Sequence, residues 1–308
     1  MANESLKKSR DTKNDEFYTK RSDIENELSK YDLNQFNGKK VYCNCDDPSW
    51  SSFFKFFKKW GKRLGLKEVH FTNFAKKDRD FTKNSYFNKL ELKESIEDDK
   101  NGTAHHWIFT PENDEIIKYK LKENGDFRSE ECINILDKCD IVVTNPPFSL
   151  LTEFLKLLID KNKQFLVIGN ENEIASRSWC SYFTEGKIWL GYTHPKEFID
   201  IEGNTKKMGF ICWYTNLNVS YRNHPIILHP QDLTEFKKYD NYDAIEIPKT
   251  KLIPDNYYGN MGVPIFFVEK FCPQQFEIVD TTPAFGQVPK IEGKKVYRRI
   301  IIRRKNEK

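Results

Sequence analysis

One segment restricts the fold of this chain more than any other. Residues 140–158 (DIVVTNPPFSLLTEFLKLL) contain a short apolar run, a proline loop and an amphipathic run, with no spacer between them. Asp140–Thr144 predicts a buried strand, and Leu150–Ile159 has the apolar spacing of a helix. Further buried strands are predicted over Lys39–Cys45 and Gln164–Gly169. Strands that alternate with helices at this spacing predict an α/β fold with a doubly wound, mostly parallel sheet.

The other predicted elements follow this alternation in the first two thirds of the chain. Helices are predicted over Asp23–Leu33, with Ser22 as N-cap, and over Ser51–Trp60; strands are predicted over Lys67–Phe74 and Lys207–Tyr214, and a hairpin over His105–Leu121. Residues 76–102 are polar and receive no element. Prolines recur beyond residue 220, which predicts an irregular or β-rich part. We therefore expect a first domain over residues 1–219 and a separate region over residues 220–308.

Composition narrows the class of protein. The 308 residues are 38% hydrophobic and 14% aromatic, which is enough for a packed core. Fifty Lys and Arg against 46 Asp and Glu leave a net charge of +4, which permits a polyanionic partner without demanding one. No run has the roughly 18 apolar residues of a membrane helix, and no signal peptide is visible, so a cytoplasmic protein without membrane contact is expected. The seven Cys and six His lack metal-ligand spacing, so no metal is expected.

The loop Asn145-Pro146-Pro147-Phe148 is the segment most suited to chemistry. Its two prolines fix the backbone and remove two donors, so the loop is rigid. A loop at the carboxyl end of a strand in an open α/β sheet lies where ligands bind. The Asn145 amide oxygen and the Pro146 carbonyl can each accept one N–H of an exocyclic amine, and Phe148 can stack on the ring that carries the amine. The alternative is a proline turn with Phe148 in the core.

This loop resembles the catalytic motif of S-adenosylmethionine-dependent amino methyltransferases, chiefly those that methylate adenine N6 in DNA. A narrower resemblance is to EcoRI-type adenine methyltransferases, in which Cys-Asp-Asp-Pro follows the first strand where most relatives carry a glycine-rich loop. The matching segments have the same order and together span about residues 15–275; they are Asp15–Thr19, Val41–Pro48, Gly125–Ser129, Asn241–Ile245 and Met261–Pro264.

The resemblance implies a Rossmann-like S-adenosylmethionine-dependent methyltransferase fold, with a cofactor-binding catalytic domain in residues 1–219 and a DNA target-recognition region in residues 220–308. It implies site-specific adenine-N6 methylation of a base flipped out of duplex DNA. The catalytic positions are then Asn145, Pro146, Pro147 and Phe148. The positions that bind S-adenosylmethionine are Phe17, Tyr18, Thr19, Cys45, Asp46, Asp47, Pro48, Asp126 and Phe127.

The cofactor positions also have structural alternatives. The Asp46–Asp47 pair can meet the methionine ammonium or lie near the sulfonium, or it can form a turn. Asp126 can accept from the cofactor adenine, or be an ordinary loop residue. Tyr18–Thr19 can close over the methionine moiety, or supply a core aromatic ring and a helix cap. The sequence departs from the family pattern at the end of the second strand, where Thr72–Asn73 replaces the acid expected to hold the ribose.

Basic residues supply candidate DNA contacts. The run VYRRIIIRR, residues 296–304, predicts a strand whose cations bind phosphate or, alternatively, protect a solvated sheet edge. A second candidate follows the strand Gln164–Gly169. The predicted DNA-binding residues are Arg177, Arg298, Arg299 and Arg303.

Two other functions stay open at this point. Asn-Pro-Pro-aromatic loops also resemble those of enzymes that methylate RNA amines or protein glutamine amides, and a methyltransferase fold can bind nucleic acid without catalysis. A dinucleotide-dependent dehydrogenase is disfavoured because no Gly-x-Gly-x-x-Gly follows the first strand. The expected protein is a monomer that acts on double-stranded DNA, either beside a cognate restriction endonuclease of the same site or as a solitary modification enzyme.

Overall fold

The computed structural model describes residues 17–76, 84–87, 89–175, 177–281, 288–296 and 299–305. The chain divides into two compact units. The first comprises the described residues of Met1–Asn170 together with Gly191–Asn218, and the second comprises Glu171–Leu190 and the described residues from Val219 onward. The backbone therefore passes between the units three times.

A mixed sheet forms the centre of the first unit. Seven of its strands lie in the order β5-β4-β3-β2-β6-β7-β11. The neighbours β3-β2, β2-β6 and β6-β7 are parallel, whereas β5-β4, β4-β3 and β7-β11 are antiparallel. The strands are β2 (Lys40–Cys43), β3 (Glu68–Thr72), β4 (His105–Thr110), β5 (Glu115–Lys120), β6 (Ile141–Thr144), β7 (Gln164–Asn170) and β11 (Ile211–Thr215). The parallel arrangement that the sequence predicts thus holds for the central strands, and the sheet as a whole is mixed.

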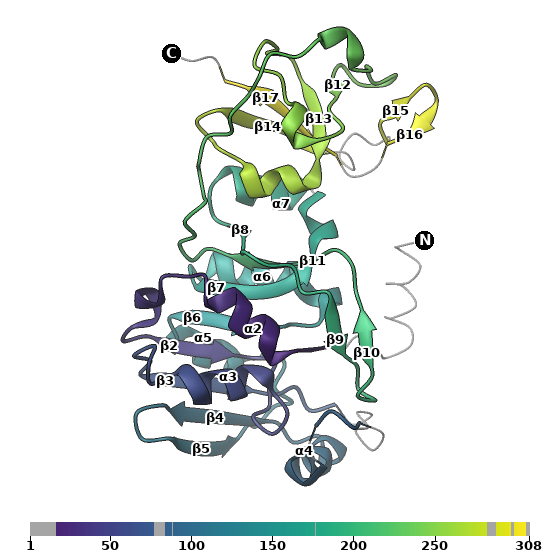
Figure 1. Cartoon of the computed structure of the whole chain (residues 1–308). Coiled ribbons are helices and arrows are strands. Elements are labelled where there is room, and N and C mark those ends of the chain that lie inside the picture. The colour runs from purple at the N-terminus through teal and green to yellow at the C-terminus, as the bar shows by residue number, and fades with distance from the viewer. Residues whose placement is uncertain are drawn as a thin grey trace. The chain divides into compact units, whose positions relative to one another are not determined.

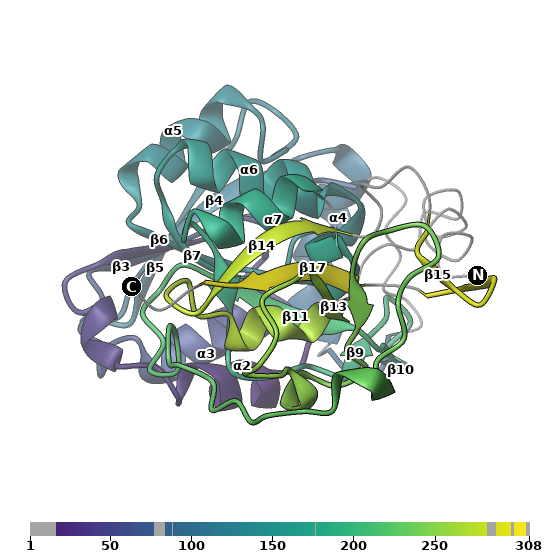
Figure 2. The ribbon, with the colours of Figure 1, turned by 90° about the horizontal axis from the view of Figure 1, so that it is seen from above.

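Helices cover both faces of this sheet. Helices α2 (Arg21–Leu28) and α3 (Ser52–Trp60) lie on one face, and α5 (Glu130–Lys138) and α6 (Leu151–Asp160) lie on the other (Figures 1 and 2). The central strands are accordingly apolar on both sides: all four residues of β6 are buried. This is the reason why these strands appear in the sequence as continuous apolar runs rather than alternating ones.

Serine caps begin two of these helices. Ser51 Oγ accepts hydrogen bonds from the backbone N–H groups of Phe53 and Phe54 at the start of α3. Ser129 Oγ accepts from the N–H of Cys132 at the start of α5. Such caps satisfy amide groups that have no partner within the helix. The first of these helices is among those predicted from the sequence, whereas no element is predicted over Glu130–Lys138.

Two sequence predictions of local structure are wrong, and a segment for which no element was predicted contains a helix. The helix expected over Asp23–Leu33 spans Arg21–Leu28 instead, and its N-cap is Lys20, not Ser22. Asp32 then accepts from the N–H of Asn34 and starts a separate 3-10 turn, η1 (Leu33–Phe36). Helix α2 therefore ends at Leu28, with Ser29 as its C-cap, and a separate turn begins after Asp32.

The second wrong prediction is the strand Lys207–Tyr214, and the segment without a predicted element is residues 76–102. Helix α4 (Lys89–Asn101) occupies part of residues 76–102. Its described buried side chains, at 92, 95 and 99, are mostly polar and give little apolar periodicity. The predicted strand is interrupted at Phe210, whose φ of 62° breaks an extended course, so β11 begins only at Ile211.

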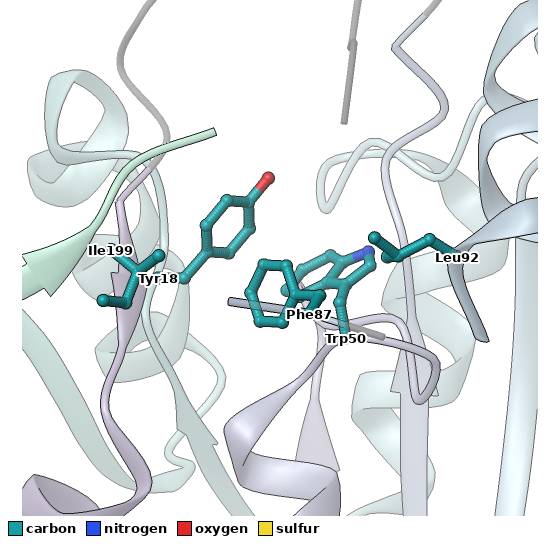
Figure 3. Packing of buried hydrophobic residues seen from close by; sticks show 5 residues of the cluster. All are labelled: Tyr18, Trp50, Phe87, Leu92 and Ile199. Carbon is teal, nitrogen blue, oxygen red and sulfur yellow. The ribbon is translucent and has the colours of Figure 1, made fainter. Parts of the chain in front are cut away.

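A small second sheet in the first unit has the order β1-β9-β10. Its strands are β1 (Tyr18–Thr19), β9 (Glu197–Ile199) and β10 (Thr205–Lys207). Tyr18 of β1 belongs to a buried cluster with Trp50, Phe87, Leu92 and Ile199 (Figure 3). This cluster joins residues from five parts of the chain and holds the N-terminal strand in place.

The second unit contains a four-stranded sheet in the order β12-β13-β17-β14 and the hairpin β15-β16. Strand β17 lies between β13 and β14, and Ile300, Ile301 and Ile302 are buried, so it is not the solvated edge strand considered above. Helix α7 packs against β14. The elements are α7 (Arg177–Thr184), β8 (Trp189–Leu190), β12 (Ile245–Glu246), β13 (Met261–Pro264), β14 (Phe276–Thr281), β15 (Lys290–Ile291), β16 (Lys294–Lys295), β17 (Arg299–Arg304) and the 3-10 turns η3 (Glu171–Ala175), η4 (Leu233–Glu235), η5 (Thr250–Leu252) and η6 (Ile265–Lys270).

Within the described ranges, no helix combines the length and apolar character needed to cross a bilayer.

Candidate active site

A cavity of about 290 Å³ lies at the carboxyl edge of the parallel strands in the first unit. Four segments supply most of its wall: residues 17–19, 44–46, 125–128 and 145–150. Residues 44–46 directly follow β2, and residues 145–150 directly follow β6. Because β2 and β6 are parallel neighbours, their carboxyl ends bring these two loops together.

Asn145 is held in the cavity wall by the N-terminal segment. Its Nδ2 donates to the Phe17 carbonyl at 2.6 Å and to Thr19 Oγ1 at 3.1 Å. The neighbouring Pro146 is buried, and no residue of the described chain donates a hydrogen bond to its carbonyl. The Asn145 Oδ1 atom and the Pro146 carbonyl are thus available as acceptors.

Phe148 lies between two other rings. Its centroid is 6.1 Å from that of Phe17, with nearly parallel ring planes, and 6.1 Å from that of Phe198 in an edge-to-face contact. Pro147 precedes it and caps the short turn η2 (Phe148–Leu150) that leads into α6. All four residues Asn145, Pro146, Pro147 and Phe148 line the cavity.

Asp46 is a buried carboxylate in the cavity wall. Its two oxygens accept hydrogen bonds from Ser51 Oγ at 2.8 Å and Thr144 Oγ1 at 2.9 Å. Burial raises the pKa of Asp46 to about 7, although both hydroxyl groups act to lower it. The adjacent Cys45 also lines the cavity, and burial raises the pKa of its thiol well above the usual range. Among the described residues no cation pairs with Asp46, so its carboxyl is only partly ionised near pH 7.

Asp47 and Pro48 do not belong to the cavity wall. Asp47 is buried and its Oδ1 accepts from the N–H and the hydroxyl of Ser49, which is the geometry of an Asx turn. The chain can therefore leave β2 sharply and enter α3.

Asp126 and Phe127 lie in the wall contributed by the loop before α5. The Arg128 guanidinium donates to Asp126 at 2.6 and 2.8 Å, and these bonds hold the pKa of the Asp126 carboxyl below its usual range. Gly125 has a φ of 79°, and a Cβ there would lie 1.9 Å from the Asn73 carbonyl oxygen. Only glycine allows this close approach of the loop to β3.

The end of β3 has no acidic side chain among its described residues. Asn73 Oδ1 accepts from the backbone N–H of His105, so its side chain fixes the sheet rather than facing the cavity. Phe74 and Lys76 line the cavity instead. Asp15, the first residue of the matching segment Asp15–Thr19, lies outside the described residues.

The predicted DNA contacts all belong to the second unit. Arg299 donates both Nε and an Nη atom to Glu246, and Arg303 pairs with Glu277 at 2.5 Å. Arg177 lies in α7 but the position of its side chain is not described, and Arg298 lies outside the described residues. Arg299 and Arg303 thus have partners within the protein, and their contact with DNA stays a prediction.

Sequence reasoning did not assign several residues of the cavity wall, namely Asn44, Trp50, Ser52, Phe53, Phe74, Lys76, Gly125, Arg128, Ser149 and Leu150. Most of them adjoin a predicted motif, so proximity in sequence was the available signal. Phe53 is buried and also lines the cavity. No group of three His, Cys, Asp or Glu suited to a metal ion occurs in the described part of the chain.

A mixed α/β sheet with a cavity at its carboxyl edge, walled by an Asn-Pro-Pro-Phe loop, is the arrangement expected of an amino methyltransferase. The family described as adenine-specific methyltransferase EcoRI matches residues 5–307 of this chain. The protein belongs to this family of enzymes.

Curated relatives agree over almost the full length. The Type II methyltransferase M.EcoRI of Escherichia coli is 39% identical, with 98% of this chain and 97% of the relative covered. The Type II methyltransferase M.MgeORF184P of Mycoplasma genitalium is 36% identical, with 95% and 96% covered. M.MpnI of Mycoplasma pneumoniae is 33% identical, with 95% and 96% covered. No solved structure matches the chain.

Proposed function

We propose that this enzyme transfers a methyl group from S-adenosylmethionine to the N6 amino group of an adenine flipped out of double-stranded DNA, at a specific site. One observation carries the proposal: a buried carboxylate and two available acceptors line the same cavity. The carboxylate is that of Asp46, and the acceptors are Asn145 Oδ1 and the Pro146 carbonyl. A carboxylate suits a cationic methyl donor, and paired acceptors suit an amine.

The residues of the cavity fit S-adenosylmethionine. When bound, this cofactor supplies an electrophilic methyl group on a sulfonium. Asp46 is buried without a cationic partner in the described chain, so a sulfonium or ammonium nearby would stabilise its ionised form. Asn44 Oδ1 and Trp50 Nε1 are buried without hydrogen-bond partners among the described residues, and both side chains belong to the wall. The aromatic side chain of Phe127 offers apolar surface to an adenine ring.

The remaining cofactor contacts are proposed from the same wall. Asp126 has lone pairs beyond those used by Arg128 and would accept from the cofactor adenine amino group. Tyr18 and Cys45 would contribute packing. The cavity has no glycine-rich loop, and S-adenosylmethionine needs none because it carries no phosphate.

The chemistry of transfer requires positioning more than acid–base strength. The lone pair of an adenine N6 is conjugated into the ring and is a poor nucleophile. Asn145 Oδ1 and the Pro146 carbonyl would accept its two N–H groups, draw the nitrogen toward sp3 geometry and stabilise the positive charge that develops there. The nitrogen becomes acidic once it has gained the methyl group, so water can take the proton. Stacking on Phe148 would offset part of the cost of flipping.

The organisation of the chain also belongs to the proposal. We assign a Rossmann-like catalytic domain to residues 1–219 and target recognition to residues 220–308. The parallel central strands with helices on both faces support the first assignment (Figures 1 and 2). The compact second unit, which starts its longer segment at Val219, supports the second. We further propose a cytoplasmic monomer that modifies DNA beside a cognate endonuclease or alone, as the Type II names of the relatives suggest.

Methylation of RNA or of a glutamine amide is the second candidate for the substrate. The family match argues against it, because it continues through the C-terminal residues that lie outside the methyltransferase cavity.

Sequencing of modified bases in DNA from cells that express the chain tests the proposal. We expect N6-methyladenine at one recurring motif, and a strongly reduced fraction of modified sites in matched cells that express Asn145→Ala. Soluble wild-type protein with no DNA mark, or an equal fraction of modified sites in the variant strain, would contradict the proposal.

A further inference from the structure

The orientation of the Asn145 amide is set by the protein itself. Its Nδ2 lies 2.6 Å from the Phe17 carbonyl oxygen and 3.1 Å from Thr19 Oγ1. A peptide carbonyl only accepts hydrogen bonds, so the Asn145 atom that faces Phe17 must be the nitrogen and not the oxygen. Both N–H groups of the amide are then used within the protein. Oδ1 remains as an acceptor on a residue that lines the cavity.

The strand that supplies these partners is firmly anchored. Successive side chains of a strand point in opposite directions, so Tyr18 turns away from Thr19. The Tyr18 ring packs edge-on against Trp50 and Phe87, at centroid distances of 4.9 and 5.2 Å, in the cluster of Figure 3. Thr19 itself is 4% exposed and lies opposite Phe198 in the register of β1 with β9.

We propose that Thr19 is a positioning residue for methyl transfer, whose hydroxyl fixes the Asn145 amide so that Oδ1 faces the target amino group. The inference rests on the proposed function and gives Thr19 a role distinct from cofactor contact. If the Asn145 amide were rotated by 180°, its Nδ2 and not its Oδ1 would face the target amino group. That amino group donates hydrogen bonds, so it needs an acceptor and would then meet a second donor. The Phe17 carbonyl alone would hold the amide less firmly, because it leaves one N–H without an acceptor.

A positioning residue and a cofactor residue differ in what their loss changes. A lost cofactor contact weakens the affinity for S-adenosylmethionine. A lost contact to Asn145 leaves that affinity intact and slows the transfer step, because the acceptor spends less time in the productive orientation.

The test is single-turnover methylation of a duplex carrying the motif found by sequencing, together with calorimetry of S-adenosylmethionine. Thr19→Val keeps the shape of the side chain and removes the acceptor, whereas Thr19→Ser keeps the hydroxyl. We expect Thr19→Val to slow transfer by about five- to tenfold, with the cofactor Kd within about twofold of wild type. Thr19→Ser should stay within about twofold in both. Thr205→Val, on the exposed strand β10 of the same small sheet, is the matched control and should change neither.

A double-mutant cycle with Asn145→Ala identifies the path of the effect. If Thr19 acts through Asn145, then Thr19→Val should not slow the residual transfer of the Asn145→Ala enzyme any further. Equal slowing in both backgrounds, a loss of cofactor affinity that accounts for the rate, or an unchanged rate in Thr19→Val would each overturn the inference.

The two levels of failure are separable. A wild-type enzyme that neither binds S-adenosylmethionine nor methylates DNA would refute the proposed function, whereas an active wild type with an equally active Thr19→Val would refute only the role of Thr19. If Thr19→Val does not fold, then Thr19→Ala takes its place in the cycle with the same expected outcomes.

Discussion

At the scale of single residues, the proposed chemistry depends on Asn145 and Asp46, which reach one cavity from two neighbouring strands. Asn145 contributes an acceptor and no proton, whereas Asp46 contributes a charge whose value depends on pH. The two side chains therefore make different experimental predictions.

Asn145→Ala should abolish most of the activity. The variant loses one of the two acceptors for the target amine, and removal of one such preorganised group costs about a hundredfold or more in rate. Cofactor affinity should stay within severalfold, because the side chain faces the target base in the proposed arrangement. Single-turnover rates and calorimetry measure the two effects, and equal turnover by variant and wild type would contradict the assigned role.

Asp46 should make cofactor binding pH-dependent. Its pKa is about 7 because the carboxyl is buried, and only the ionised form attracts a sulfonium or ammonium. Affinity for S-adenosylmethionine should therefore be level above about pH 8 and fall toward tenfold per pH unit below 7. Calorimetry across this range should show proton release on binding near pH 7, and Asp46→Asn should bind weakly with no such dependence.

The raised pKa of Asp46 affects the stability of the ligand-free protein in the opposite direction: it favours folding at low pH, whereas it favours cofactor binding at high pH. Since the pKa of Asp46 is above its ordinary value of 3.8, the folded state binds the proton more tightly than the unfolded state. This contribution to the free energy of unfolding is present at low pH and is lost as pH rises through about 7. Thermal unfolding of wild type and Asp46→Asn between pH 5 and 8 should show that difference.

At this scale the sequence predicted a rigid Asn145–Phe148 loop at the end of a strand, because two prolines in one short segment leave few conformations, and the structure has this loop in the cavity wall. Its chemistry stays a prediction. The sequence could not predict that Asp47 forms a turn while its neighbour Asp46 faces the cavity. The two adjacent carboxyls differ only in the direction in which the backbone points them. In the fold, Thr144 donates to Asp46 and Ser49 donates to Asp47, and neither partner can be read from the pair itself.

At the scale of elements, the two serine caps offer a matched comparison. Ser51 caps α3 and also donates to Asp46, whereas Ser129 caps α5 and has no contact with that carboxyl. Replacement of either by alanine should lower the free energy of unfolding by about 1 kcal/mol. Only Ser51→Ala should also raise the pKa of Asp46 and move the pH dependence of cofactor binding upward. Equal pH profiles in the two variants would contradict the proposed link between α3 and the cavity.

Most elements with apolar periodicity were predictable and those without it were not, although the short helix α5, with Cys132, Ile135 and Leu136 buried, was missed. The strands β2, β6 and β7 are continuous apolar runs, and the Phe side chains of α3 recur on one face, so both types stand out. Helix α4 buries Ser95 and Asp99 beside Leu92, and its sequence therefore resembles that of a loop. Pairing of β1 with β9 joins residues almost 180 positions apart, and no local signal indicates it.

At the scale of the whole molecule, residues 171–190 belong to the second unit, although residues 191–218, which follow them, belong to the first. Within residues 171–190 the side chains of Ile174, Trp179 and Phe183 are buried, and α7 packs against β14 in the second unit. A chain that ends at Asn218 keeps α7 and lacks β14. We expect that fragment to expose apolar surface and aggregate, and a fragment in which a short flexible linker also replaces residues 171–190 to be more soluble.

Light scattering and binding of a hydrophobic dye would compare the two fragments. Equal light scattering and equal dye binding by the two fragments would contradict the prediction. Full-length protein is the reference, since only it contains both segments of the second unit.

If the part of the second unit from residue 220 onward carries target recognition, as proposed, then the three crossings between the units also restrict how such an enzyme can acquire a new recognition sequence. A recognition module encoded by one continuous stretch can be exchanged by a single recombination event. Here the second unit is interrupted by Gly191–Asn218, which contributes β9, β10 and β11 to the first. Any exchange that moves only the C-terminal segment separates α7 from its packing partner, so changes in specificity are expected to accumulate by point substitution rather than by shuffling.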